Sequence, residues 1–265
     1  MSVINSIFSD DKKFNATLIS EDSGILSGVE GAVNLIEEIG IKDYKILDEG
    51  DSLEPGKVIA KVCGNPAQLA SLEERLAGQV TKYSAIATAA RSAIENAEGK
   101  VRIVCGAYKK IDYEIKEKMR QAVKTGGADT RMVEGQTFRY IDKNYIRMLG
   151  GVKKSIDHIK TSSDMVIVIQ IHRALQTFEK EVEEALESKA DILMIDTGKL
   201  KDIRLCREII EEKQPSYKPL IAYSGNVSLD SIKEYANSGD IDILDIGKAI
   251  IDSPMLDVKF EVEIE

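Results

Sequence analysis

The chain has 265 residues, of which 43% are hydrophobic and 31% charged, and it carries a formal net charge of −9 at pH 7. A chain of this length buries a substantial core, and its acidic excess argues against nucleic acid or an anionic membrane as the main partner. No apolar run approaches the ~18 residues of a membrane span, and the N-terminus lacks the basic and apolar regions of a secretory signal. We therefore expect a cytoplasmic protein.

The N-terminal part has the pattern of a small sheet with helices. Residues 16–62 alternate short apolar runs with glycine-rich turns, which is typical of short strands. One helical pattern fits residues 29–39. A longer one covers residues 65–97, where Pro66 suits the first turn of a helix. This long helix should carry the chain from a small domain to a larger one.

From residue 101 onward, β-rich runs alternate with amphipathic helical patterns, which predicts βα units and a parallel sheet. The predicted strands are residues 101–105, 140–141, 165–171, 191–195, 219–223 and 241–246. The predicted helices are residues 113–124, 150–160, 175–188, 200–213 and 229–237. This is a β/α barrel with fewer than eight visible units. Residues 256–265 alternate apolar and acidic side chains, which predicts a half-exposed strand that returns to the small sheet.

In such a barrel the working groups lie at the C-terminal ends of the strands and in the loops that follow. Glycine turns follow two consecutive predicted strands, in Ser224-Gly225-Asn226 and in Gly247-Lys248. Backbone N–H groups at such turns bind phosphate, although a glycine also serves simply to make a tight turn. Two turns on consecutive strands leave these interpretations about equal.

Asp196 ends an apolar run, so its carboxylate should face the barrel mouth, where it would hold Mg²⁺ or sugar hydroxyls. The alternative is a helix-capping aspartate. Alternation places His172 on the same side as Gln170, and a hydrogen-bonded structural role is favoured for this histidine. Basic side chains near the mouth would neutralise a small anionic substrate, although some are only surface charges. They are Lys109, Lys110, Arg131, Arg139, Lys143 and Arg173.

The three cysteines are widely spaced, and neither histidine lies near a cysteine in a metal-ligand pattern, so disulfides and structural zinc are not expected. All three are interpreted as small buried side chains, with a minor chance of chemistry for Cys105 at a strand end.

Several motifs resemble the quinolinate phosphoribosyltransferase family, the nicotinate-nucleotide pyrophosphorylases of NAD synthesis. In the N-terminal part they are EDSGILSG at residues 21–28, EGDSLEPG at residues 49–56, EER at residues 73–75 and SAIAT at residues 84–88. In the barrel they are TGG at residues 125–127, the strand ending at Gln170, Ile195-Asp196, Ser224-Gly225 and residues 245–247. The resemblance covers nearly the whole chain.

The resemblance implies an α/β fold of two domains. Residues 1–98 would form an N-terminal α/β sandwich with linking helices, joined by the strand in residues 256–265. Residues 99–255 would form an incomplete β/α barrel of about seven strands, as in type II phosphoribosyltransferases. The family condenses quinolinate with phosphoribosyl pyrophosphate, using Mg²⁺, and forms homodimers or larger assemblies in which each subunit helps to complete its partner's site.

The resemblance also assigns roles to residues. Arg75 matches an arginine that is delivered across the dimer interface, and Arg131 matches the arginine after the family's glycine-rich loop. Asp196 matches the carboxylate for metal and ribose. The phosphate-binding residues would be Ser224, Gly225, Asn226, Gly247 and Lys248.

The base-binding side departs from the family pattern. Where the family has Asp-Thr-Arg-Lys-Thr after the first barrel strand, this chain has CGAYK at residues 105–109, so that Lys109 or Lys110 would substitute only with a shifted backbone. The family's Gly-Gly-Gly-Val-Asn-His-Arg loop is shorter by one residue here, at residues 126–131, and lacks its histidine. A family lysine moves by one position to Lys143. A family glutamate becomes Gln170, and the aspartate after it becomes His172.

A site that has lost about two cations would leave part of the charge of quinolinate unpaired. We therefore expect a phosphoribosyltransferase-like enzyme that uses Mg²⁺ and phosphoribosyl pyrophosphate with a pyridine-carboxylate-like or other nitrogen base. The candidate catalytic residues are Arg75, Lys109, Arg131, Gln170 and Asp196, and the candidate substrate-binding residues are Tyr108, Lys110, Lys143 and His172. The alternatives are an inactive paralogue that binds a nucleotide or sugar phosphate in a regulatory role, and a different phosphate-using barrel enzyme.

Overall fold

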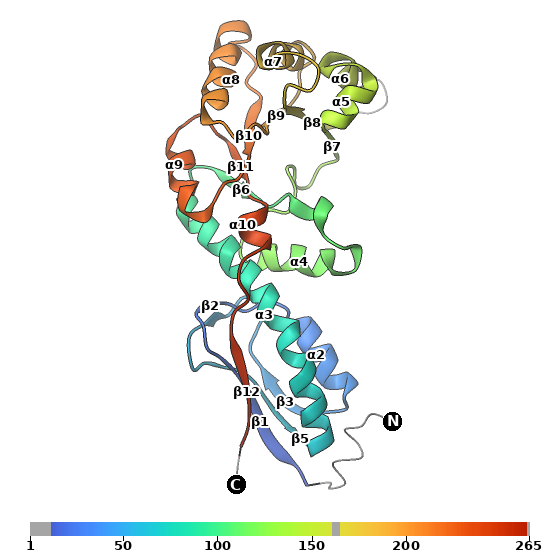
Figure 1. The fold of residues 1–265 in the computed structure, drawn as a ribbon, viewed down its shortest axis with the longest axis vertical. Helices are drawn as coiled ribbons and strands as arrows, with labels where there is room; N and C mark the ends of the chain where they lie inside the picture. The colour runs from blue at the N-terminus through green and yellow to red at the C-terminus, as the bar shows by residue number, and fades with distance from the viewer. Residues whose placement is uncertain (1–11, 161–164, 264–265) are drawn as a thin grey trace. The chain divides into compact units, whose positions relative to one another are not determined.

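The computed structural model describes residues 12–160 and 165–263, which form two compact units (Figure 1). Of the described residues, the first unit contains 12–92, Lys110–Gly127 and 250–263. The second contains Ala93–Lys109 and Ala128–Ala249. The division expected from the sequence, at residues 98 and 255, differs from these units in three segments: residues 93–98, 110–127 and 250–255. Within the described ranges, no helix is both long and apolar enough to span a membrane.

The first unit is built on a four-stranded antiparallel sheet in the order β12-β1-β5-β3. The strands are β1 (Phe14–Ser20), β3 (Asp43–Ile46), β5 (Val58–Gly64) and β12 (Val258–Val262), and a separate pair is formed by β2 (Gly24–Ile25) and β4 (Ser52–Leu53). Leu18 of β1 and Ile59 of β5 are buried in one core with Ile36 of helix α2 (Val29–Glu38). The C-terminal strand thus lies in the same sheet as the first strand of the described chain.

Helix α3 (Pro66–Ala97) has 32 residues and begins at the proline that the sequence placed in its first turn. Its start is fixed by a reciprocal cap. The Asn65 side chain accepts a hydrogen bond from the Gln68 backbone N–H at 2.9 Å, and the Gln68 side chain accepts one from the Asn65 N–H at 3.0 Å. These two backbone N–H groups at the helix start, which have no acceptor within the helix, thereby gain one. Leu72 and Leu76 of this helix are part of the hydrophobic core of the first unit. Helix α4 (Tyr113–Thr125) also belongs to this unit.

The second unit contains a six-stranded parallel sheet in the order β6-β11-β10-β9-β8-β7. Its strands are β6 (Arg102–Val104), β7 (Phe138–Ile141), β8 (Val166–Ile171), β9 (Ile192–Ile195), β10 (Leu220–Ser224) and β11 (Ile243–Asp245). Beyond β6, Asp129 forms a parallel bridge with Val104 and supplies a seventh, single-residue position. The predicted α/β fold is therefore confirmed, with a parallel sheet of six strands and this single bridge beside it.

The helices that follow these strands are α5 (Lys143–Leu149), α6 (Val152–Lys160), α7 (Phe178–Glu187), α8 (Leu200–Lys213), α9 (Ile232–Asn237) and α10 (Lys248–Ile251). Two 3-10 turns, η1 (Ala107–Lys110) and η2 (Leu229–Ser231), complete the set. Val168, Met194 and Ala222 lie in one buried cluster, contributed by three neighbouring strands. Strands covered on both faces read as continuous apolar runs, which is why these strands were visible in the sequence.

The helix predicted over residues 150–160 is present as α6, which begins two residues later, and a separate helix that was not predicted, α5, precedes it. The break lies at Gly150 and Gly151, whose φ angles are +81° and +136°, a backbone region that favours glycine. The Asp142 carboxylate starts α5 by accepting hydrogen bonds from the N–H groups of Asn144 and Tyr145.

Candidate active site

Asp196 and Gln170 are joined at the carboxyl ends of neighbouring strands β9 and β8. The Gln170 side chain is buried, and its Nε2 donates to Asp196 Oδ2 at 2.6 Å. Its Oε1 accepts a hydrogen bond from the backbone N–H of Lys143, the first residue of α5, at 2.8 Å. The amide therefore fixes the half-buried Asp196 carboxylate and the loop after β7 at the same time.

His172 lies half-buried just after β8, and its ring is tied to the loop after β9. Its Nδ1 is 2.5 Å from the backbone oxygen of Asp196. With the neutral imidazole protonated at Nδ1, this nitrogen donates to the carbonyl oxygen. The geometry is that of a side chain holding a backbone segment in place, whereas a role toward a substrate stays a prediction.

The loop after β8 is organised by two buried carboxylates that the sequence had not singled out. Glu181 of α7 is 1% exposed, and its carboxylate accepts from four successive backbone N–H groups, residues 172–175, at 2.5–3.4 Å. Arg173 has a φ of +54°, and its guanidinium makes two 3.0 Å hydrogen bonds to Asp202. The Arg173 hydrogen bonds hold the pKa of this carboxyl below its usual range. The loops after β8 and β9 are therefore braced against each other.

Lys109 and Asp142 form the basic–acidic pair on the β7 side of the mouth. Lys109 Nζ lies 2.7 Å from Asp142 Oδ2 and 5.6 Å from the centre of the Tyr140 ring, and the Lys109 side chain is 76% exposed. Burial raises the pKa of Asp142, but the hydrogen bonds from Lys109 and from the start of α5 outweigh it, so that the net pKa is lowered. The pKa of Tyr140 is raised by burial and by three carboxylates, those of Asp245, Asp196 and Asp142.

Asp245 ends β11 beneath the segment that follows β6. Its Oδ1 accepts a hydrogen bond from the Gly106 N–H at 2.7 Å, and a Cβ on residue 106 would lie only 2.6 Å from its Oδ2. Burial raises the pKa of Asp245 to about 6, with the Gly106 hydrogen bond opposing this shift and Asp196 adding to it. Gly106 and Asp245 therefore depend on each other, because only a glycine at position 106 leaves room for the Asp245 carboxylate.

The two glycine turns also lie close to neighbouring loops. Gly225 has a φ of +139°, and a Cβ there would meet the Gly198 Cα at 2.6 Å, two residues after Asp196. A Cβ on Gly247 would meet the Ala107 Cβ at 3.0 Å. Ser224, Gly225 and Gly247 are half-buried, whereas Asn226 and Lys248 are exposed. The Gly225 turn therefore packs against the loop that carries Asp196.

The other predicted site residues are more dispersed. Arg131 is exposed on the segment after the Asp129 bridge, and Tyr108 is buried within η1, the turn that ends with the exposed Lys110. Arg75 and Lys110 belong to the first unit, and Tyr108 and Arg131 to the second.

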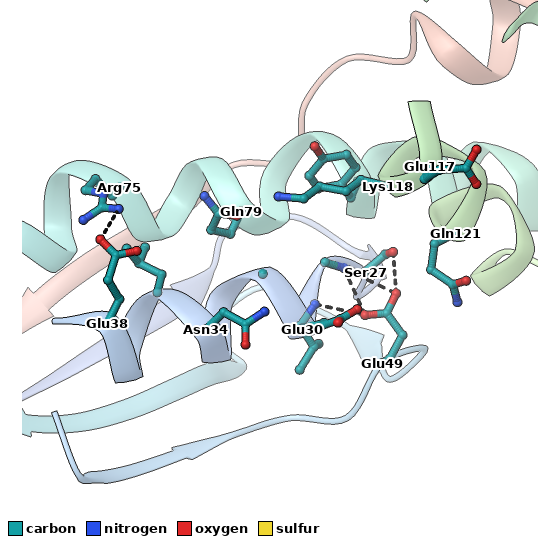
Figure 2. A pocket seen from close by; sticks show the side chains of 15 residues that line it. Ser27, Glu30, Asn34, Glu38, Glu49, Arg75, Gln79, Glu117, Lys118 and Gln121 are labelled. Carbon is teal, nitrogen blue, oxygen red and sulfur yellow. Dashed lines mark hydrogen bonds and ion pairs between the residues drawn. The ribbon is translucent and has the colours of Figure 1, made fainter. Parts of the chain in front are cut away.

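Arg75 lines a cavity of about 800 Å³ in the first unit, between helices α2, α3 and α4. Its Nη2 pairs with Glu38 Oε1 at 3.0 Å, and Gln79 and Lys118 line the same cavity (Figure 2). At the other end, the Glu49 carboxylate accepts hydrogen bonds from the backbone at the start of α2 and from two hydroxyl groups, those of Ser27 and Thr125. The cavity is therefore lined by polar side chains, which include both positively and negatively charged groups.

In the ranges the structure covers, three or more His, Cys, Asp or Glu side chains are nowhere grouped so that they could hold a metal. Mg²⁺ is commonly bound through one or two carboxylates together with substrate phosphates and waters. A half-buried Asp196 beside glycine turns fits that mode of binding, in which the substrate supplies most of the oxygen ligands.

Comparisons with known proteins agree along nearly the whole chain. The family model for the quinolinate phosphoribosyl transferase N-terminal domain matches residues 3–84, and the model for the C-terminal domain matches residues 86–261. A probable nicotinate-nucleotide pyrophosphorylase [carboxylating] of Methanocaldococcus jannaschii is 27% identical over 97% of this chain and 90% of its own length. The human nicotinate-nucleotide pyrophosphorylase [carboxylating] is 25% identical over 93% of this chain and 82% of its own.

Two solved structures show the same fold. The nicotinate-nucleotide pyrophosphorylase from Francisella tularensis has a TM-score of 0.83 and 20% identity, covering 99% of this chain and 90% of that one. The enzyme of the same name from Pyrococcus furiosus has a TM-score of 0.83 and 22% identity, covering 98% of this chain and 72% of that one. Since the two family models together span nearly the whole sequence, this chain belongs to the quinolinate phosphoribosyl transferase family.

Proposed function

We propose that this protein transfers the phosphoribosyl group of phosphoribosyl pyrophosphate to a nitrogen base and releases pyrophosphate. The observation that carries the proposal is the arrangement around Asp196, which is fixed by Gln170 and lies two residues before the turn packed against Gly225. A carboxylate beside a phosphate-binding turn suits a sugar phosphate with its metal ion.

The reaction asks the protein chiefly to position reactants and stabilise separating charge, since the ribose passes through an oxocarbenium-like state. The backbone N–H groups at Gly225 and Gly247 would bind the 5′-phosphate, and Asp196 would bind the ribose hydroxyls. Arg131 would meet the pyrophosphate. Mg²⁺, held by Asp196 together with the substrate's own oxygens, would neutralise the charge that builds up on the leaving pyrophosphate.

We further propose a homodimer in which Arg75 of the partner subunit completes each site. The Arg75 side chain is 46% exposed, so it would exchange its ion pair with Glu38 for one with the substrate of the partner subunit. Sedimentation of wild-type protein and titration of the Arg75→Ala variant with phosphoribosyl pyrophosphate test this. A monomeric protein, or unchanged affinity in the variant, would contradict the shared site.

Quinolinate is not the acceptor that the mouth favours. Of the two substituting lysines, Lys109 is already paired with Asp142, and Ala107 and Tyr108 stand without a positive charge where the family resemblance placed an arginine and a lysine. A dicarboxylate would meet unpaired carboxylates rather than arginine. The acceptor is therefore another nitrogen base, which includes less anionic pyridine derivatives.

Calorimetric titration with phosphoribosyl pyrophosphate and Mg²⁺, followed by pyrophosphate release over a panel of pyridine, pyrimidine and imidazole bases, tests the function. Asp196→Asn should lose at least ~10-fold in affinity or turnover, since it removes one charged ligand. Asp230→Asn, at an exposed aspartate of the second unit, is the control. No binding at millimolar ligand would refute the proposal.

A second candidate is a non-catalytic family member that binds a nucleotide or sugar phosphate in a regulatory role. Gln170 favours it, because a neutral amide now makes the hydrogen bond to Asp196 that fixes the mouth. Tight binding of phosphoribosyl pyrophosphate without pyrophosphate release from any base would support this candidate. Turnover with a single base would exclude it.

A further inference from the structure

The cavity that Arg75 lines in the first unit has a second cationic side chain in its wall, that of Lys118 on α4 (Figure 2). Arg75, Gln79 and Tyr83 line the cavity from α3, and their spacing of four residues places them on one face of that helix. Lys118 reaches from α4 toward Gln79, the middle member of this row (Figure 2). The wall thus offers a guanidinium, an amide and an ammonium in succession, all of them hydrogen-bond donors.

Gly31 of α2 leaves the space into which two of these donors extend. A Cβ at position 31 would lie 2.7 Å from Gln79 Oε1 and 3.7 Å from Lys118 Nζ, so both side chains pass over bare helix backbone. Glycine within a helix is less favourable than alanine, and the φ angle of Gly31 is not in the left-handed region that would require it. The glycine therefore serves the open space above α2 rather than a turn.

Lys118 is the cation of this cavity that has no partner. Three of the four lining carboxylates are engaged within the first unit: those of Glu38, Glu49 and Glu117. The fourth, Glu30, lies in the first turn of α2, where a negative charge favours the helix dipole. Within residues 12–160 and 165–263, Lys118 forms no ion pair or hydrogen bond. A solvated lysine is common on any surface, but this one shares a cavity with an arginine and faces a row of donors.

We propose that Lys118 is a substrate-binding residue that acts together with Arg75 on the partner subunit's site, where it binds the pyrophosphate group of phosphoribosyl pyrophosphate. This inference rests on the proposed phosphoribosyl transfer and on the shared site proposed for Arg75. A ligand that reaches Arg75 through the cavity also meets Gln79 and Lys118, because the three groups lie in one wall.

The pyrophosphate group is the substrate part that suits this wall. It carries several negative charges on an elongated set of oxygens, which matches a row of donors that includes two cations. The acceptor base proposed above is the less anionic reactant, so it has less need of a further cation. Lys118 would also add positive charge where the leaving pyrophosphate gathers electrons, which favours its departure.

Substitutions at Lys118 test the contact with the pyrophosphate. Lys118→Met removes the charge with little change in length, and Lys118→Arg keeps the charge. Calorimetric titration with phosphoribosyl pyrophosphate and Mg²⁺ should show about 10-fold weaker binding by Lys118→Met, the effect of one charge-assisted contact, and binding close to wild type by Lys118→Arg. The KM of the acceptor base should stay unchanged. Lys124→Met, at an exposed lysine of α4 outside the cavity, is the control and should bind as the wild type does.

Mixed dimers show which subunit's site Lys118 serves. Lys118→Met and Asp196→Asn chains, each impaired alone, are co-expressed so that their dimers form at random. A mixed dimer then has one site in which Asp196 is intact and the partner's Lys118 is intact, so about a quarter of the wild-type activity should return. If Lys118 served the site of its own chain, no site of a mixed dimer would be intact and activity would stay low, which overturns the proposal.

The remaining outcomes separate this inference from the proposed function. Unchanged affinity in Lys118→Met, an equal loss in Lys124→Met, or an effect confined to the KM of the base overturns the role of Lys118, while turnover by the wild-type protein still supports phosphoribosyl transfer. Absence of binding by the wild-type protein is a different result, seen before any variant is made, and it refutes the proposed function together with this inference.

Discussion

Replacing Asp245 with asparagine should stabilise the second unit at neutral pH. The carboxylate is enclosed at the end of β11, with one hydrogen bond from Gly106 and with Asp196 nearby, and its pKa is raised to about 6. An unfolded aspartate titrates near ~3.9. Asparagine has almost the same shape and still accepts the Gly106 hydrogen bond, but it removes the burial of a negative charge.

The magnitude and its pH window follow from the difference between those pKa values. Each pKa unit corresponds to ~1.4 kcal/mol, so a difference of about two units gives roughly 3 kcal/mol as an upper bound. Partial solvent access lowers this to about 2 kcal/mol. Because the folded protein holds the proton more tightly, the penalty is absent below about pH 4, develops as the pH rises, and is complete above about pH 6.

The assay is urea unfolding of the wild-type and Asp245→Asn proteins at pH 8 and at pH 4.5, without Mg²⁺. The variant should gain about 2 kcal/mol at pH 8 and distinctly less at pH 4.5. Asp230→Asn, the exposed control, should change little at either pH. A loss of stability at pH 8, or the same gain at both pH values, would refute the reasoning.

Three further variants probe the loops of the second unit. Gly106→Ala should destabilise by about 1–3 kcal/mol because its Cβ would overlap Asp245, and a double-mutant cycle with Asp245→Ser should recover most of that loss. Glu181→Leu should cost about 3 kcal/mol or more in urea unfolding, since four backbone N–H groups lose their acceptor; an unchanged midpoint would rule out this role. Arg173→Ala should lower the free energy of unfolding by about 3–5 kcal/mol, because it leaves the Asp202 carboxylate buried and unpaired. Adding Asp202→Asn should restore part of this stability, which thermal unfolding of the single and double variants would measure.

The sequence predicted strands such as β8 and β9 well because they are runs of buried apolar side chains, whereas β7, which contains the exposed Arg139, was predicted only at residues 140–141. Asp196 was identified because it directly follows such a run, and Gln170 because the family resemblance places a strand end there. Asp245 was passed over as a site residue because Ile246 continues the apolar run beyond it, so the run appeared to end one residue after β11 does. The rule that working side chains lie at the C-terminal ends of strands located Asp196, but it applies to Asp245 only once the end of β11 is known.

Glu181 and Asp202 left no signal in the sequence. Both belong to amphipathic helices, in which an acidic residue in the first turn usually faces solvent and favours the helix dipole. Their role depends on a backbone loop that folds back over the helix start, and backbone N–H groups are the same for every residue type. The small helix α5 was missed because its seven residues are too few for a periodic pattern.

The pairing of β12 with β1 has a consequence for synthesis. Strand β1 begins at Phe14, whereas its neighbour β12 begins at Val258, so the two partners are made far apart in time. Until the last part of the chain has left the ribosome, β1 carries a row of open hydrogen-bonding groups along one edge, a template for pairing with other chains. The order of translation thus makes the first unit the last to be completed and a natural client for chaperones while the barrel emerges.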